Sequence, residues 1–195
     1  MLQPFGRGVR AENNTIFDTS GRSFEGIHTI QIAKKLQEAG FAVVMMAEIG
    51  IDFQKHGCPD PVAMPQNIGL RQWAGIISRA DYFLGCDSVG QHIAYALDIP
   101  ATVVVGSTFP INVSYPDYDR FDILDMGGDL RKYSPIRITI DEVADRVNDG
   151  IMKMNEAIED VIVKSVVDGT EKFSIEVEET PDISVTSSCS TGCSH

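Results

Sequence analysis

Residues 81–108 constrain the fold more than any other stretch of this chain. They begin with a short apolar run at residues 82–85, of the kind that forms a buried strand. A polar turn at residues 86–90 carries the residue types that end a strand and begin a helix. Apolar positions at helical spacing follow over residues 91–97, and a β-branched run occupies residues 101–105. This pattern predicts a βαβ unit whose turns lie at the carboxyl edge of a parallel sheet, where open α/β sheets bind ligands.

The residues before this unit predict further elements of the same sheet. Residues 2–6 occupy the place of a first strand, although the run is short. Residues 7–22 are polar and predict a loop. A helix with apolar positions at helical spacing follows, with Ser23 as its cap and Gly40 as its stop. The next apolar run, residues 41–46, predicts a second strand covered on both faces.

The middle of the chain is expected to be less regular. Residues 49–69 hold three prolines and three glycines, and predict a connection with a short helix near Phe53 and a brief strand near Val62. Residues 70–79 then predict a helix. Beyond the βαβ unit we expect an exposed loop at residues 112–118.

The last third of the chain predicts a short strand at residues 121–124 and a helix that a capping box opens at residues 139–142. We expect this helix to run to about residue 163. A hairpin turn is indicated by Asp168-Gly169 between apolar-alternating runs. Residues 184–195 have the composition of a disordered tail.

These elements predict an α/β fold, with a Rossmann-like parallel sheet covered by helices on both faces. We divide the chain into a Rossmann-like domain, residues 1–163, and an acidic extension, residues 164–195. Residues 141–195 contain 13 acidic side chains against 4 basic ones, so much of the net charge lies there.

Composition excludes several function classes. The net charge of −12 argues against a nucleic-acid partner and against adhesion to an anionic membrane. No apolar run reaches the length of a bilayer span, and no secretory signal pattern is present at the start, so we expect a cytoplasmic protein without membrane insertion. The cysteines are few and unevenly spread, and they do not suggest a disulfide framework.

The turn at the end of the first βαβ strand has the chemistry of a phosphate site. A pyrophosphate needs backbone N–H groups and the positive end of a helix, which the segment beginning at Ser88 would offer. The Ser88 hydroxyl and the His92 ring can donate hydrogen bonds to phosphate oxygens, and Gly90 leaves room for close approach to the backbone. Asp87 is expected to cap the helix or to hold the turn. The alternatives are an ordinary helix cap at Asp87 and Ser88 and a packing role for His92.

A longer stretch of sequence around this turn resembles a known protein family. Residues 70–81 read LRQWAGIISRAD, and the same register continues with Asp87-Ser88, His92-Ile93-Ala94, Ala96-Leu97, Pro100 and Gly106-Ser107-Thr108. Over about forty residues this text resembles the heptosyltransferase-like family, glycosyltransferase family nine.

The resemblance implies one half of a two-domain glycosyltransferase of the B type, the C-terminal half that binds the donor. It implies a nucleotide-diphosphate sugar as donor substrate, of the ADP-heptose type, and a role in lipopolysaccharide biosynthesis. Transfer in the family inverts the anomeric carbon and uses a carboxylate of the other domain as base. A partner chain or self-association would therefore have to supply the acceptor domain here, and we assign no catalytic residue.

The resemblance and the predicted edge of the sheet add five candidate donor-binding residues. Glu48 follows the second strand, where an acidic residue can accept hydrogen bonds from ribose hydroxyls, with a solvated loop carboxylate as the alternative. Ser20 and Arg22 lie in the loop where the family contacts the donor phosphates, and Ser107 and Thr108 lie at the carboxyl edge.

We expect neither a cofactor nor a metal. Cys189, Cys193 and His195 in the tail supply only three ligands, and three ligands do not close a tetrahedral structural zinc site.

Two functions from different classes remain. The first is glycosyl transfer, with this chain as the donor-binding half. The second is a non-catalytic nucleotide- or glycan-binding module, or an assembly subunit that uses the acidic extension. A third hypothesis is another enzyme with the same fold that acts on a sugar nucleotide or a phosphate, because fold alone does not determine function.

Overall fold

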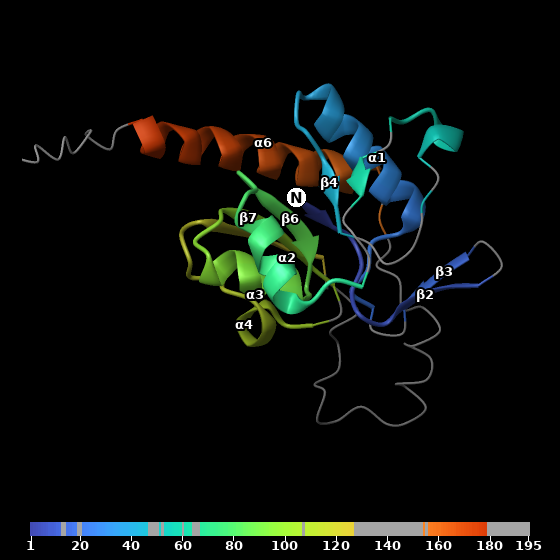
Figure 1. Cartoon of the computed structure of the whole chain (residues 1–195), viewed down its shortest axis with the longest axis horizontal. Coiled ribbons are helices and arrows are strands. Elements are labelled where there is room, and N and C mark those ends of the chain that lie inside the picture. Colours follow the sequence, from blue (N-terminus) through green and yellow to red (C-terminus); the bar gives the residue numbers. More distant parts are fainter. Residues whose placement is uncertain are drawn as a thin grey trace, which may run out of the picture.

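The centre of the computed structural model is a six-stranded, all-parallel sheet (Figure 1). The structure describes residues 1–12, 15–18, 21–46, 51, 53–59, 61–63, 67–106, 108–126, 154 and 156–178. The sheet strands are β1 (Leu2–Gln3), β4 (Val44–Met45), β5 (Val62–Ala63), β6 (Phe83–Cys86), β7 (Ala101–Val105) and β8 (Phe121–Asp125).

The strand order makes this sheet Rossmann-like. Across the sheet the strands run β5-β4-β1-β6-β7-β8, so the chain first builds outward from β1 on one side and then returns to build from β6 on the other. Numbered by their order in the chain, the sheet strands lie 3-2-1-4-5-6, as in dinucleotide-binding folds. The side of the sheet to which the chain adds strands changes between β1 and β6, while all strands stay parallel. The predicted α/β class is confirmed.

Helices cover both faces of the sheet. On one face lie α1 (Gly26–Glu38) and α6 (Glu156–Glu178), and on the other lie α2 (Leu70–Ile77) and α3 (Val89–Ala96) (Figure 1). Every residue of β6 and β7 is buried, because both faces of these strands are covered. Leu84 and Val104 point into the core under α1 and α6, whereas Phe83 and Val103 point into the core under α2 and α3.

A buried carboxylate attaches α6 to α1. Glu159 is only 3% exposed and contacts Lys35 Nζ at 2.8 Å and His28 Nδ1 at 2.5 Å, both on α1. Hydrogen bonds from the Lys35 ammonium to Asp160 and to Glu159 raise the pKa of Lys35. Because a buried carboxylate is stable only when it is paired, these contacts determine where α6 begins to pack.

Several elements lie where the sequence predicted them. The 3₁₀ helix η1 (Gln54–His56) and the strand β5 confirm the short helix near Phe53 and the strand near Val62. Helix α1 ends before Gly40, whose φ of +93° favours glycine. The cap prediction at Ser23 is wrong: the N-cap residue is Glu25, and the Ser23 hydroxyl instead accepts the N–H of Gly6 at 3.0 Å.

The loop predicted at residues 7–22 is wrong in part. Strands β2 (Val9–Glu12) and β3 (Thr15–Asp18) form an antiparallel hairpin there, with Val9 opposite Asp18 and Glu12 opposite Thr15. Two asparagines separate the strands in the sequence, and asparagine is a residue type that tight turns favour. A short helix, α4 (Pro110–Val113), likewise overlaps the loop expected at residues 112–118.

The hairpin predicted at Asp168-Gly169 is also wrong, because α6 runs through both residues without a break. Ile162, Val166 and Phe173 are buried at helical spacing, so this face packs on the sheet and overrides the local turn signal. Helix α6 also crosses the predicted domain boundary at residue 163. The division of the chain stays a prediction, and the tail at residues 184–195 and most of the helix predicted from residue 139 lie outside the described residues.

Gly169 is required where α6 passes over the sheet. A Cβ atom there would lie 2.3 Å from the Tyr82 hydroxyl and 2.8 Å from its ring. That hydroxyl is 3.0 Å from Thr102 Oγ1, which is 2.7 Å from Ser165 Oγ of α6, and Ser165 donates in turn to Asp122. Burial raises the pKa of Tyr82 to about 12. The Tyr82 ring therefore cannot move aside without breaking this buried chain of hydroxyls.

We expect Gly169→Ala to lower the free energy of unfolding by about 1–2 kcal/mol, because the clash with Tyr82 exceeds the gain of up to about 1 kcal/mol in helix propensity. The matched control is Gly75→Ala in α2, where a Cβ atom meets nothing within 4 Å. This control is expected to gain about 0.5–1 kcal/mol. Urea unfolding of both variants measures the difference, and equal effects would contradict the close packing of α6 on Tyr82.

Candidate functional site

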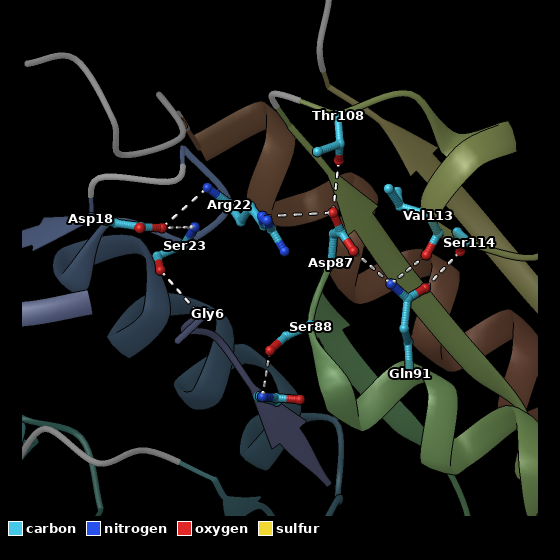
Figure 2. Close-up of polar contacts among 11 residues, drawn as sticks. Gly6, Asp18, Arg22, Ser23, Asp87, Ser88, Gln91, Thr108, Val113 and Ser114 are labelled. Atoms are coloured by element: carbon cyan, nitrogen blue, oxygen red, sulfur yellow. Dashed lines mark hydrogen bonds and ion pairs between the residues drawn. The ribbon is translucent and has the colours of Figure 1, made fainter. Parts of the chain in front are cut away.

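The candidate site lies where β1 and β6 end, at the carboxyl edge of the sheet. The strand order reverses between these neighbouring strands, and the crevice outside such a reversal is the usual ligand site of open α/β sheets. Residues following β1, β3, β6 and β7 meet here (Figure 2).

Asp87 is at the centre of these contacts. It follows β6 directly, and only 2% of the residue is exposed. Its Oδ1 accepts a hydrogen bond from Gln91 Nε2 at 2.9 Å, and its Oδ2 accepts one from Thr108 Oγ1 at 2.7 Å (Figure 2). Arg22 Nε lies 3.9 Å from the same Oδ2. Because these partners come from three separate segments, one buried carboxylate ties the edge together.

Arg22 brings a cation to this edge. Its backbone is held in place by Asp18, whose Oδ2 accepts the N–H groups of Arg22 at 3.1 Å and Ser23 at 2.8 Å. The Arg22 Nε atom is buried without a hydrogen-bond partner, while 42% of the side chain is exposed. Within the described part of the chain, the guanidinium therefore has N–H donors left for an anion.

Ser88 and Gly90 are held by a residue of β1. Gln3 is buried, accepts the Gly90 N–H on its Oε1 at 3.0 Å, and donates from its Nε2 to Ser88 Oγ at 3.1 Å. A Cβ atom at Gly90 would lie 2.1 Å from Gln3 Oε1 and 2.7 Å from the Phe83 ring. Glycine is thus required here by the protein's own packing, whereas its predicted role in leaving room for a ligand stays a prediction.

His92 lies apart from this group. It is exposed on α3, and its Nδ1 is 2.9 Å from the Tyr115 hydroxyl. Tyr115 in turn stacks on Tyr95, with ring centroids 3.7 Å apart. The structure therefore places His92 beside the aromatic rings of Tyr95 and Tyr115, and within the described part of the chain it makes no hydrogen bond or ion pair with Asp87 or Arg22.

Gln91 is a site residue that was not predicted from the sequence. Its side chain is fully buried, donates to Asp87 and to the Val113 carbonyl at 3.0 Å, and accepts the Ser114 hydroxyl at 2.7 Å (Figure 2). It therefore anchors the segment that follows α4 to the site carboxylate. A polar residue in register with the apolar position at Ala94 was the available signal, since i and i+3 share one face of a helix.

The remaining candidates divide into two groups. Thr108 is described and bonds to Asp87. Three other predicted site residues, Ser20, Glu48 and Ser107, lie outside the described residues. The tail residues for which no metal site was expected lie outside them too: Cys189, Cys193 and His195.

Among the described residues, the edge has the chemistry to bind an anion and shows no activated nucleophile. Arg22 and the amino end of α3 both favour negative charge. The Cys86 thiol lies close by, but complete burial raises its pKa and keeps it protonated. Over the described ranges, no three His, Cys, Asp or Glu side chains are placed to hold a metal ion. In the same part of the chain, no helix is long and apolar enough to cross a membrane.

The fold agrees with what the resemblance to family nine implied. Its α/β architecture is similar to one half of a B-type glycosyltransferase fold. A glycosyl transferase family 9 protein from Veillonella parvula has a similar solved structure, at 14% identity and a TM-score of 0.53, with 80% of this chain and 43% of that chain covered.

Two further solved structures match less well. They are the E. coli heptosyltransferase WaaC with ADP, at 15% identity, TM-score 0.49 and 76% and 43% coverage, and the E. coli ADP-heptose heptosyltransferase II, at 15% identity, TM-score 0.47 and 76% and 46% coverage. This chain thus spans less than half the length of each protein. No protein-family model and no curated protein sequence matches it.

Replacing Gln91 by methionine, which is similar in size but apolar, should lower the free energy of unfolding by at least about 2 kcal/mol. The change leaves Asp87 Oδ1, the Val113 carbonyl and the Ser114 hydroxyl without their partner. Gln31→Met on the outer side of α1 is the matched control and should change stability by less than about 0.5 kcal/mol. Urea unfolding compares the two variants, and similar losses would argue against Gln91 as an anchor of the site.

Proposed function

We propose that this chain binds the diphosphate of a nucleotide sugar between the ends of β1 and β6, as the donor-binding half of a glycosyltransferase. The observation that carries the proposal is the position of Arg22: it lies at the reversal of strand order, beside Asp87, and Asp87 directly precedes the N-cap residue of α3. A diphosphate there would meet a cation and a helix amino terminus together.

The contacts of Arg22 support a binding role. At 3.9 Å its Nε is too far from Asp87 for a hydrogen bond, so the carboxylate orients the guanidinium without using its donors. Guanidinium groups bind phosphate oxygens in a bidentate manner, and such charge-assisted bonds are stronger than neutral ones. Ser88, which is half-buried, adds a hydroxyl at the start of α3.

The finer assignments rest on the sequence resemblance. We propose an ADP-linked heptose as the donor, Glu48 as a ribose ligand, and Ser20, Ser107 and Thr108 as further groups near the phosphates. A role in lipopolysaccharide assembly in the cytoplasm, with a partner domain that binds the acceptor, belongs to the same proposal. A contact with His92 would require a donor substrate that extends along α3 from the diphosphate.

Isothermal titration with ADP tests the site. We expect saturable binding that Arg22→Gln weakens about tenfold or more, because a hydrogen bond to a charged group contributes about 1.5–3 kcal/mol. Arg79→Gln is the matched control, since Arg79 follows α2 at the opposite edge of the sheet. Absence of any heat and of any shift in melting temperature with ADP would refute the site, and equal weakening in both variants would refute the role of Arg22.

A second candidate function is nucleotide binding without transfer. It is favoured by the state of the two buried carboxylates at this edge: Asp18 accepts backbone N–H groups, and Asp87 accepts Gln91 and Thr108. Neither is free to remove a proton from an attacking hydroxyl.

Release of ADP from ADP-heptose tests whether the chain acts on the donor without a partner domain. We expect the chain alone to bind this donor and to release ADP no faster than buffer does, because a general base within reach of an acceptor is missing among the described residues of the site. The control is the same assay with Asp87→Asn, which should not change the background rate. Release well above background would show that the chain is an active transferase by itself.

A further inference from the structure

A cavity of about 510 Å³ lies at the amino edge of the sheet, opposite the candidate site. The segments that lead into β1, β4 and β6 line it, together with the end of α1 and the middle of α6. Figure 1 shows the amino terminus beside β4, β6 and α6, at this same edge. None of the residues that contact Asp87 borders it.

The shape of the cavity follows from short side chains. Along α6, the face toward the cavity carries Val166, Thr170 and Ser174, spaced one turn apart. Thr170 Oγ1 donates to the Val166 carbonyl at 2.7 Å, and Ser174 Oγ donates to the Thr170 carbonyl at 2.8 Å. Because both hydroxyls are bonded within the helix, this wall presents mainly carbon atoms to the cavity.

The opposite wall is apolar as well. Leu2, Leu36 and Leu84 line it and are almost fully buried, and the chain after α1 passes through Gly40 and Ala42, which carry little or no side chain. Small-molecule sites occupy about 300–1,000 Å³, and the volume of this pocket, which is partly open to solvent, lies in that range.

Charged side chains lie at the opening of the cavity and indicate that a bound apolar molecule would carry a polar end there. Arg79 and Asp81 both line the opening and are exposed. Burial lowers the pKa of the Met1 amino group to about 6, against the opposing effect of Asp81, and this group donates to the Tyr82 carbonyl at 2.9 Å. No carboxylate pairs with the Arg79 guanidinium within the described part of the chain. The rim thus carries the Arg79 guanidinium, which has no ion-pair partner among the described residues, together with the exposed Asp81 carboxylate.

We propose that this cavity is a second binding site, for a small amphipathic carboxylate whose apolar chain enters between α1 and α6 and whose carboxylate pairs with Arg79. The site is independent of the nucleotide site, because the two lie at opposite edges of the sheet and share no lining residue.

Titration of the full chain with decanoate, below its micelle-forming concentration, tests the proposal, with decanol as the uncharged probe. We expect saturable binding of decanoate, and weaker binding of decanol. Arg79→Met should weaken decanoate about fivefold or more and leave decanol unchanged, since it removes only the charge pair. Arg71→Met on the exposed face of α2 is the matched control and should leave both probes unchanged.

A second variant tests the interior of the cavity. Thr170→Leu should abolish binding of both probes and raise the melting temperature, because the larger side chain fills the space. The melting curve of each variant shows whether it folds. The proposal is overturned if decanoate does not bind the unaltered chain, if Arg79→Met and Arg71→Met behave alike, or if a folded Thr170→Leu still binds both probes. ADP binding, measured in parallel, reports separately on the nucleotide site.

Discussion

A buried negative charge organises the carboxyl edge of this protein. Asp87 loses its water when the strand that precedes it is covered on both faces, and it is stable only because Gln91, Thr108 and Arg22 converge on it. Each partner belongs to a different segment, so satisfying one carboxylate fixes the loop before α1, the first turn of α3 and the segment after β7. The same contacts hold Arg22 in the orientation that the proposed donor site needs.

The two ends of the sheet differ because different residues close them. At the carboxyl edge, polar side chains converge on the buried Asp87 carboxylate, and the Arg22 side chain stays partly exposed. At the amino edge, α6 crosses the strands with glycine, threonine and serine on its inner side, and the space that remains is apolar. Helix α6 reaches that position because Glu159 pairs with α1 and because Tyr82 packs where Gly169 has no side chain.

Elements with a strong local pattern were predictable. The strand, turn, helix and strand of residues 81–108 each carry their own signal, and the structure has all four. Elements whose signal depends on distant residues were not. The local sequence at Asp168-Gly169 predicts a turn, but Ile162, Val166 and Phe173 pack on the sheet and keep this segment helical. The β2–β3 hairpin lies in a stretch whose composition indicated only a loop. Within the site, Asp87 and Arg22 were identified as candidates, but Gln3 and Gln91 were not, because their importance arises from partners far away in the sequence.

By itself, the sequence determined the class of fold and the edge of the sheet at which the candidate site lies, since hydrophobic periodicity and turn residues act over a few positions. Only the tertiary structure decided which side chains meet. It showed that Gly90 serves internal packing, that His92 turns toward Tyr115, and that Arg22 lies beside Asp87. Those outcomes depend on the pairing of β1 with β6 and on the hydrogen-bond partners that the buried Asp87 carboxylate needs. Neither can be predicted from the few residues around any one of these positions.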